Sequence, residues 1–180
     1  MMPMPRHPLG TPRVLAIDPT VRGYAFAILE GPNALIEWGV SQVAPKEKNR
    51  RCVKSIEEKI IRYEPEVVVL EDCAGAGSRR SARVRQLIEQ LDLLAAKRSI
   101  TRRRFSRSRI RTVFQFVGKP NKEAIAKAIA ERFPELRPRL PRVRKIYMSE
   151  DERMNIFDAV SLALAYFGPK AVPEKAQSAD

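Results

Sequence analysis

Hydrophobic positions in this chain of 180 residues follow two patterns, one typical of strands and one typical of helices. Continuous or alternating apolar runs predict five strands, at Val14–Ile17, Tyr24–Leu29, Leu35–Val43, Val67–Leu70 and Ile100–Phe105. The first three strands are joined by short segments with turn chemistry, such as Gly31-Pro32-Asn33, so we expect them to be antiparallel.

Apolar residues at helical spacing predict five helices. They cover Asn49–Tyr63, the segment around Val84–Leu94, the segment around Ile110–Val117, Asn121–Phe133 and about Glu150–Phe167. Ser106 or Ser108 and Asn121 are suitable N-caps, and Gly168-Pro169 ends the last helix. The intervening Pro134–Pro141 is expected to be extended. Three strands followed by alternating helices and strands predict an α/β protein, with a mixed sheet that has helices on its faces.

The length is that of one domain. We expect a flexible Pro-rich leader over residues 1–12, one folded domain over 13–168 and a disordered tail over 169–180. No apolar stretch approaches the roughly 20 residues of a membrane span, and the leader lacks the apolar core of a signal peptide. Cys52 and Cys73 match no metal-binding spacing and are expected to be apolar residues of a reducing compartment. The sequence therefore predicts a cytoplasmic protein that makes no membrane contact.

Charge is the unusual feature of the composition. Lys and Arg number 34 against 21 Asp and Glu, which gives a net charge of +13. Between Arg79 and Lys145 the chain has 21 basic and 5 acidic residues, so the surplus is confined to about a third of the sequence. The single histidine, His7, lies in the leader, which argues against histidine-based catalytic triads and histidine-rich zinc sites.

The basic segment also contains Phe105, Ile110 and Phe114, which assigns it to folded elements rather than to a solvated arm. Arginine predominates, and its planar fork suits contact with phosphate. We therefore expect nucleic acid to be bound through its backbone and shape. The candidate binding residues are Arg79, Arg80, Arg83, Arg102, Arg103, Arg104, Arg107, Arg109, Arg111 and Lys119.

Three carboxylates stand out in this basic protein. Asp18 and Glu71 each end an apolar strand, and Asp158 interrupts the apolar helix segment Ile156–Val160. If the three meet, their mutual repulsion is relieved by divalent cations, and Mg²⁺ prefers oxygen ligands of this kind. Two such ions can activate water and stabilise the leaving oxygen of a phosphodiester. Acids beside a basic surface thus indicate a metal-dependent nuclease. Each acid alone also fits a structural role, Asp18 as a turn residue and Asp158 as a partnered helix acid.

The segments Val14–Pro19, Val67–Glu71 and Phe157–Ala163 resemble the acid-bearing motifs of RuvC-type Holliday junction resolvases. These enzymes belong to the RNase H-like, retroviral-integrase superfamily. The resemblance covers about Val14 to Phe167 and implies that residues 13–168 form an RNase H-like nuclease domain. Lys122 resembles the lysine that such resolvases place beside the scissile phosphate.

The family implies Mg²⁺-dependent cleavage of branched DNA by a homodimer with two Mg²⁺ ions in each site, and Mn²⁺ is expected to substitute. By this resemblance Asp18, Glu71 and Asp158 are metal ligands and, with Lys122, catalytic residues. Family members usually carry a second acid three residues before the last one, and here that position is Asn155. Asn155 lies on the same helix face as Asp158, whereas Asp151 could replace it only if the helix begins after Asp151.

Two alternatives keep the same fold. One is an RNA-processing nuclease of the YqgF type, and the other is a nucleic-acid-binding module with a decayed site, for which Asn155 is the motivating residue. The apolar stripe Val84–Leu94 has two readings as well, since it could form a dimer interface or pack in the core.

Overall fold

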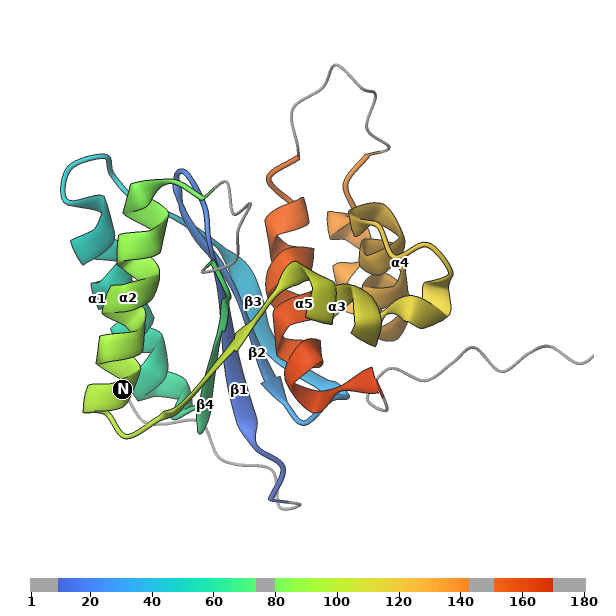
Figure 1. The fold of residues 1–180 in the computed structure, drawn as a ribbon, viewed down its shortest axis with the longest axis horizontal. Helices are drawn as coiled ribbons and strands as arrows, with labels where there is room; N and C mark the ends of the chain where they lie inside the picture. Colours follow the sequence, from blue (N-terminus) through green and yellow to red (C-terminus); the bar gives the residue numbers. More distant parts are fainter. Residues whose placement is uncertain (1–9, 74–79, 143–150, 170–180) are drawn as a thin grey trace, which may run out of the picture.

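The computed structural model describes residues 10–73, 80–142 and 151–169. A five-stranded sheet forms the middle layer and has helices on both faces (Figure 1). Helices α1 (Lys48–Tyr63) and α2 (Ala82–Lys97) cover one face. Helix α5 (Met154–Phe167) covers the other face, and α3 (Arg107–Val113) and α4 (Lys122–Arg132) pack against α5. The predicted α/β class, with a mixed sheet flanked by helices, is confirmed.

The sheet has the strand order β3-β2-β1-β4-β5. Its strands are β1 (Arg13–Pro19), β2 (Gly23–Glu30), β3 (Ala34–Gln42), β4 (Val67–Glu71) and β5 (Thr101–Phe105). The first three are antiparallel neighbours, whereas β4 runs parallel to both β1 and β5. Because β1 and β4 are parallel, their carboxyl ends lie at the same edge of the sheet.

Side chains of β1 and β4 alternate between two separate cores. One core joins α5 to Val14, Ala16, Val67 and Val69. The other joins α1 and α2 to Leu15, Ile17, Val68 and Leu70. All of these strand residues are at most 3 % exposed, as expected for strands covered on both faces.

The turn between β1 and β2 depends on Gly23. Its amide donates to the Thr20 hydroxyl at 3.1 Å, and the Thr20 amide donates to the Gly23 carbonyl at 2.9 Å. A Cβ on Gly23 would lie 1.9 Å from the Ser41 carbonyl oxygen, so only glycine permits this approach of β2 and β3.

Several helix ends form where the sequence predicts them. The Ser106 hydroxyl accepts from the Arg109 amide at 3.2 Å, and the Asn121 side chain accepts from the Ala124 amide at 2.8 Å. These are the N-caps of α3 and α4. Gly168 ends α5 with a φ of 83°.

Three predicted segments differ from the structure. The helix expected through Val117 ends as α3 at Val113 and continues as a short 3₁₀-helix, η1 (Gln115–Val117), which stops at Gly118 with a φ of 81°. Pro134–Pro141 is not extended over its whole length, because Pro134–Arg139 form a second 3₁₀-helix, η2, that buries Leu136. Proline is compatible with the first position of a helix, where its missing N–H has no partner to lose.

The third difference is the start of the last helix. Helix α5 begins at Met154, and Asp151 precedes it. Glu150, the predicted first residue, lies outside the described residues.

The apolar stripe of α2 belongs to the core. Val84, Leu87, Ile88 and Leu91 pack with the odd-numbered residues of β1, and each is at most 3 % exposed. Cys52 is buried in the same core, and neither it nor Cys73 forms a disulfide. None of the helices in the described residues combines the length and hydrophobicity needed to cross a bilayer.

Candidate active site

Asp18 and Glu71 are brought together by the parallel pairing of β1 and β4. The register pairs Ile17 with Leu70, so the next residues of the two strands are the two acids. Alternation then directs both carboxylates to the α5 face, since Ala16 and Val69, two residues earlier, belong to the α5 core. Both acids are nearly buried, with 2 % of Asp18 and 7 % of Glu71 exposed.

Asp158 reaches the same place from α5. Its neighbours Phe157 and Ala159 are buried in the core that α5 shares with the sheet. Lys122, the first residue of α4, donates to Asp158 Oδ2 at 2.8 Å. The Asn121 cap therefore fixes the start of the helix that carries Lys122. The packing of α4 on α5 then brings Lys122 to Asp158.

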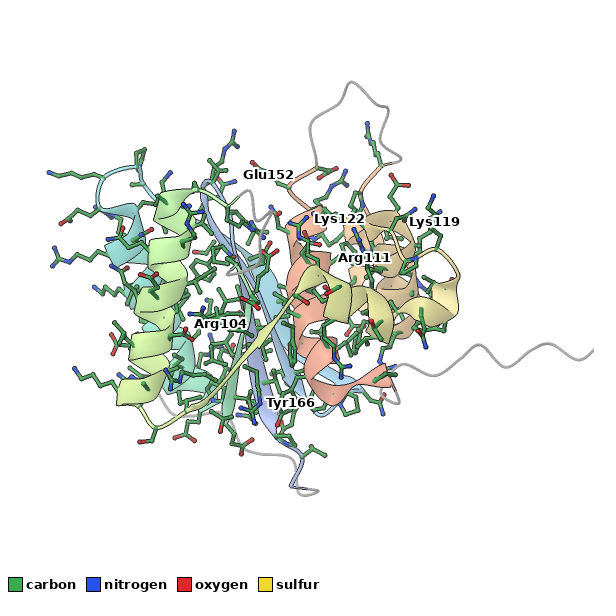
Figure 2. All side chains as sticks on the ribbon, viewed as in Figure 1. Arg104, Arg111, Lys119, Lys122, Glu152 and Tyr166 are labelled. Atoms are coloured by element: carbon green, nitrogen blue, oxygen red, sulfur yellow. The ribbon has the colours of Figure 1, made fainter. Side chains whose placement is uncertain are left out.

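The four predicted catalytic residues, Asp18, Glu71, Asp158 and Lys122, line one pocket of about 150 Å³. The pocket is also lined by apolar side chains of α3, α4 and α5, among them Ile110, Ile125, Phe157 and Leu162. Lys122 and Arg111, which both line it, are labelled near the start of α5 in Figure 2. The structure thus joins all four residues from separate parts of the chain at a single site.

Two arginines lie among the acids. Arg80 donates from Nη2 to Asp18 Oδ1 at 2.6 Å and from Nε to Glu71 Oε2 at 2.7 Å. Arg107 donates from Nε to Glu71 Oε1 at 2.9 Å. With the Lys122–Asp158 pair, three cationic side chains contact three carboxylates. Arg111 also lines the pocket and adds a fourth cationic side chain.

Burial and charge shift the pKa values of these groups. Burial raises the pKa of Asp18 to about 7; Arg80 opposes this shift, whereas Asp158 and Glu71 add to it. Burial alone would lower the pKa of Arg80, but the charges of Asp18 and Glu71 raise it, so the guanidinium stays protonated. A carboxyl that binds a proton this readily is a group for which a cation and a proton compete.

The donor chemistry of the pocket suits a hard divalent cation. Asp18, Glu71 and Asp158 supply carboxylate oxygens, the ligands that Mg²⁺ and Mn²⁺ take. In the described part of the chain, however, no three His, Cys, Asp or Glu side chains are grouped as a metal site. As they stand, these carboxylates pair with arginine or lysine side chains. The fit of the residues to the ion therefore rests on their donor chemistry, three carboxylates that line one pocket.

The two candidates for a fourth ligand lie outside the pocket lining. Asn155 is on α5, one turn before Asp158, and is half-buried. Asp151 precedes the helix, as its proposed role requires, but both of its carboxylate oxygens accept hydrogen bonds from Arg153. The hydrogen bonds to Arg153 also lower the pKa of Asp151.

The predicted nucleic-acid-binding residues separate into groups. Arg80 and Arg107 contact the acids, and Arg83 ties α2 to Asn49 of α1 and to the Thr20 carbonyl. Arg104 pairs with Asp92 of α2. The exposed remainder is Arg102, Arg103, Arg109, Arg111 and Lys119. Figure 2 shows Arg104 on β5 and Lys119 beyond the other end of α3. Arg79 lies outside the described residues.

Sequence reasoning placed Arg80 and Arg107 on the nucleic-acid surface and missed their contacts with the acids. The only local signal was their position, because Arg80 follows Glu71 by nine residues and Arg107 begins the helix after β5. A contact between residues 62 apart, such as Arg80 with Asp18, leaves no trace in local periodicity.

The fold is similar to those of solved Holliday junction resolvases. The Thermus thermophilus RuvC in complex with a Holliday junction substrate is 17% identical over 89% of this chain and 95% of that chain, with a TM-score of 0.65. The yeast mitochondrial resolvase Ydc2 is 14% identical, over 90% of this chain and 79% of that chain, with a TM-score of 0.57. The fowlpox virus resolvase is 15% identical, over 86% of this chain and 96% of that chain, with a TM-score of 0.53.

No protein-family model matches the chain, and no curated protein matches its sequence. At these low identities the likeness concerns the arrangement of the backbone. In this chain that arrangement is the mixed sheet with parallel β1 and β4 and the helix that carries Asp158. The chain therefore has the RNase H-like fold of the RuvC-type Holliday junction resolvases.

Proposed function

We propose that this protein is a Mg²⁺-dependent endonuclease that cleaves branched DNA such as Holliday junctions. The observation that carries the proposal is the convergence of Asp18, Glu71 and Asp158 in one pocket with Lys122 beside them. Arg111, which is exposed and lines that pocket, provides a matching phosphate contact. The fold it shares with solved resolvases, one of them bound to a junction, supports the choice of substrate.

In the proposed reaction the three carboxylates bind two divalent ions. When bound, these ions activate water and stabilise the leaving oxygen of the phosphodiester. Lys122 contacts a phosphate oxygen in this proposal, which is supported by the position of its ammonium beside Asp158. Arg111, exposed and on the pocket wall, holds the backbone of the entering strand. Asn155 or Asp151 completes the ligand set, and Mn²⁺ substitutes for Mg²⁺.

A homodimer follows from the symmetry of the substrate. A four-way junction has two equivalent strands to nick, and two copies of the chain related by a twofold axis would place one pocket at each. The mass of a protein–junction complex in solution tests this part of the proposal separately from cleavage.

The first experiment incubates the protein with a synthetic four-way junction in Mg²⁺ and in EDTA. We expect paired symmetric nicks in Mg²⁺ alone. Asp18→Asn is expected to lower the nicking rate by roughly a thousandfold or more, because it removes one of the three carboxylates that would hold the ions, while binding persists. Wild-type nicking by that variant would contradict the assignment.

A second candidate, the nucleic-acid-binding module, is favoured by one observation, the occupation of all three acids by cationic side chains. It predicts tight junction binding that weakens with salt and no turnover with any divalent ion. Structured RNA in place of the junction tests the third candidate, an RNA-processing nuclease. Nicks in RNA but not in the junction would select it.

A further inference from the structure

The guanidinium of Arg80 lies between the carboxylates of the β1 and β4 strand ends. Besides its bonds to Asp18 and Glu71, its Nη1 donates to the Pro19 carbonyl at 3.0 Å. All three contacts come from the two strand ends that present the acids. One cationic side chain thus bridges two carboxylates at the point where a divalent ion would bridge them.

Arg80 differs from its partners in exposure. Its side chain is 22% exposed, whereas those of Asp18 and Glu71 are 3% and 10% exposed. It also lines the pocket, so it can leave the acids without passing through the core. Glu71 keeps a second arginine, Arg107, whose side chain is 58% exposed. Arg80 is therefore a partly exposed cation that contacts a buried pair of acids from the side of the pocket.

We propose that Arg80 occupies the acid pair when no divalent ion is bound and transfers to a backbone phosphate when nucleic acid enters the pocket. This inference rests on the proposed function. Arg80 and a bridging ion compete for the same carboxylate oxygens, so the ion binds only if the guanidinium leaves. A phosphate offers the guanidinium the same bidentate geometry as a carboxylate. Nucleic acid and the ion then favour each other's binding, and linkage requires that the effect be reciprocal.

The test measures binding of Mn²⁺ alone to the free protein by calorimetry. Arg80→Gln is expected to bind Mn²⁺ at least about tenfold more tightly than the wild type, because the ion no longer displaces a competing cation. Arg80→Lys keeps the charge but lacks the fork, and we expect it to be intermediate. Asp18→Asn removes one of the acids. The part of the calorimetric Mn²⁺ signal that this variant loses is the part that comes from the site.

Arg98→Gln is the matched control. Arg98 is an arginine of the same segment that donates to a carboxylate, Glu57 of α1, at 2.6 Å. This pair lies at the end of α2 and does not line the pocket. We expect its Mn²⁺ affinity to equal that of the wild type. Equal affinities of Arg80→Gln and Arg98→Gln would overturn the proposal and leave Arg80 as a structural pair.

A second readout covers loss of folding. In EDTA, Arg80→Gln is expected to melt below the wild type, since two buried acids lose their shared cation. Mn²⁺ is expected to raise the melting temperature of Arg80→Gln more than that of the wild type. A ligand that binds only the folded state stabilises it more when its affinity is higher. An equal or smaller rise would contradict the proposal, and Arg80→Lys repeats both measurements if Arg80→Gln does not fold.

The reciprocal arm uses fluorescence anisotropy of a labelled four-way junction, with Ca²⁺ or EDTA. Ca²⁺ takes the same oxygen ligands, and we expect it to tighten junction binding by the wild type several-fold and by Arg80→Gln less. Equal tightening in both would overturn the coupling. Failure of the proposed function looks different, because the junction would then stay intact in Mg²⁺ whatever the Mn²⁺ affinity of Arg80→Gln.

Discussion

The two ends of β1 each hold a buried acid paired with an arginine, but the two arginines differ in exposure and in what surrounds them. At the start of the strand, Arg13 pairs with Glu30 at 2.8 Å and donates to the Tyr63 carbonyl at 2.7 Å; both side chains are at most 6% exposed. At the other end Asp18 is as deeply buried, but its partner Arg80 opens onto a pocket with two further acids.

This difference separates structural acids from site acids. Glu30 ends an apolar strand just as Asp18 and Glu71 do, so the position of an acid after an apolar run does not distinguish them. Glu30 sits opposite Arg13 across an antiparallel pair, and the two charges cancel. Asp18 instead has Glu71 beside it on a parallel strand. Like charges forced together cost stability, and a protein keeps such an arrangement where it serves binding or catalysis.

Breaking the structural pair should give the largest effect on stability. Arg13→Met removes the guanidinium from the buried Glu30 carboxylate, and we expect the free energy of unfolding to fall by about 3–5 kcal/mol. Urea denaturation measures the change. Adding Glu30→Leu should recover most of it, because an apolar pair needs no charge compensation. A loss below about 1 kcal/mol for Arg13→Met would mean that water reaches this end of the strand.

At the Asp18 end of β1, removing the charge should raise the free energy of unfolding instead of lowering it. This gain should appear only above acidic pH. Because the pKa of folded Asp18 is raised to about 7, the folded chain binds a proton more tightly than the unfolded chain. The wild type therefore loses stability as the pH rises from about 4 through 7, and Asp18→Asn does not. In EDTA the variant should be more stable at pH 8, by an amount of the order of a few kcal/mol, with the gap closing toward pH 4. Thermal melts of both proteins across this pH range measure the difference. A stability difference that does not change with pH would contradict the argument that burial raises the pKa of Asp18.

The smallest expected effect concerns the rim of the pocket. Arg111 is exposed and lines the pocket, so Arg111→Gln should weaken junction binding several-fold and reduce the salt dependence by about one phosphate contact. Anisotropy titrations at several salt concentrations measure both. Arg98→Gln should change neither. An Arg111→Gln variant that loses nicking but binds normally would assign Arg111 to the chemistry instead of to backbone contact.

Most of the fold could be predicted because most of its helices and strands are indicated by residues that lie close together in the sequence. Apolar runs located β1 and β4, and the caps Ser106 and Asn121 located two helix starts. The errors fall where local chemistry is ambiguous. The proline-rich Pro134–Arg139 can be extended or 3₁₀, and burial of Leu136 decides between them.

The α/β architecture, the three candidate acids and the basic character of the chain follow from the order of the amino acids, because periodicity, turn chemistry and charge are local properties. The alignment of Asp18 with Glu71 depends on the parallel register of β1 and β4, which is a property of the folded sheet. The side chains that neutralise these acids are brought to them by packing in three dimensions. Arg80, Arg107 and Lys122 reach them through packing between helices and strands far apart in the chain, and the energy of an ion pair depends on distance and burial that no local pattern records.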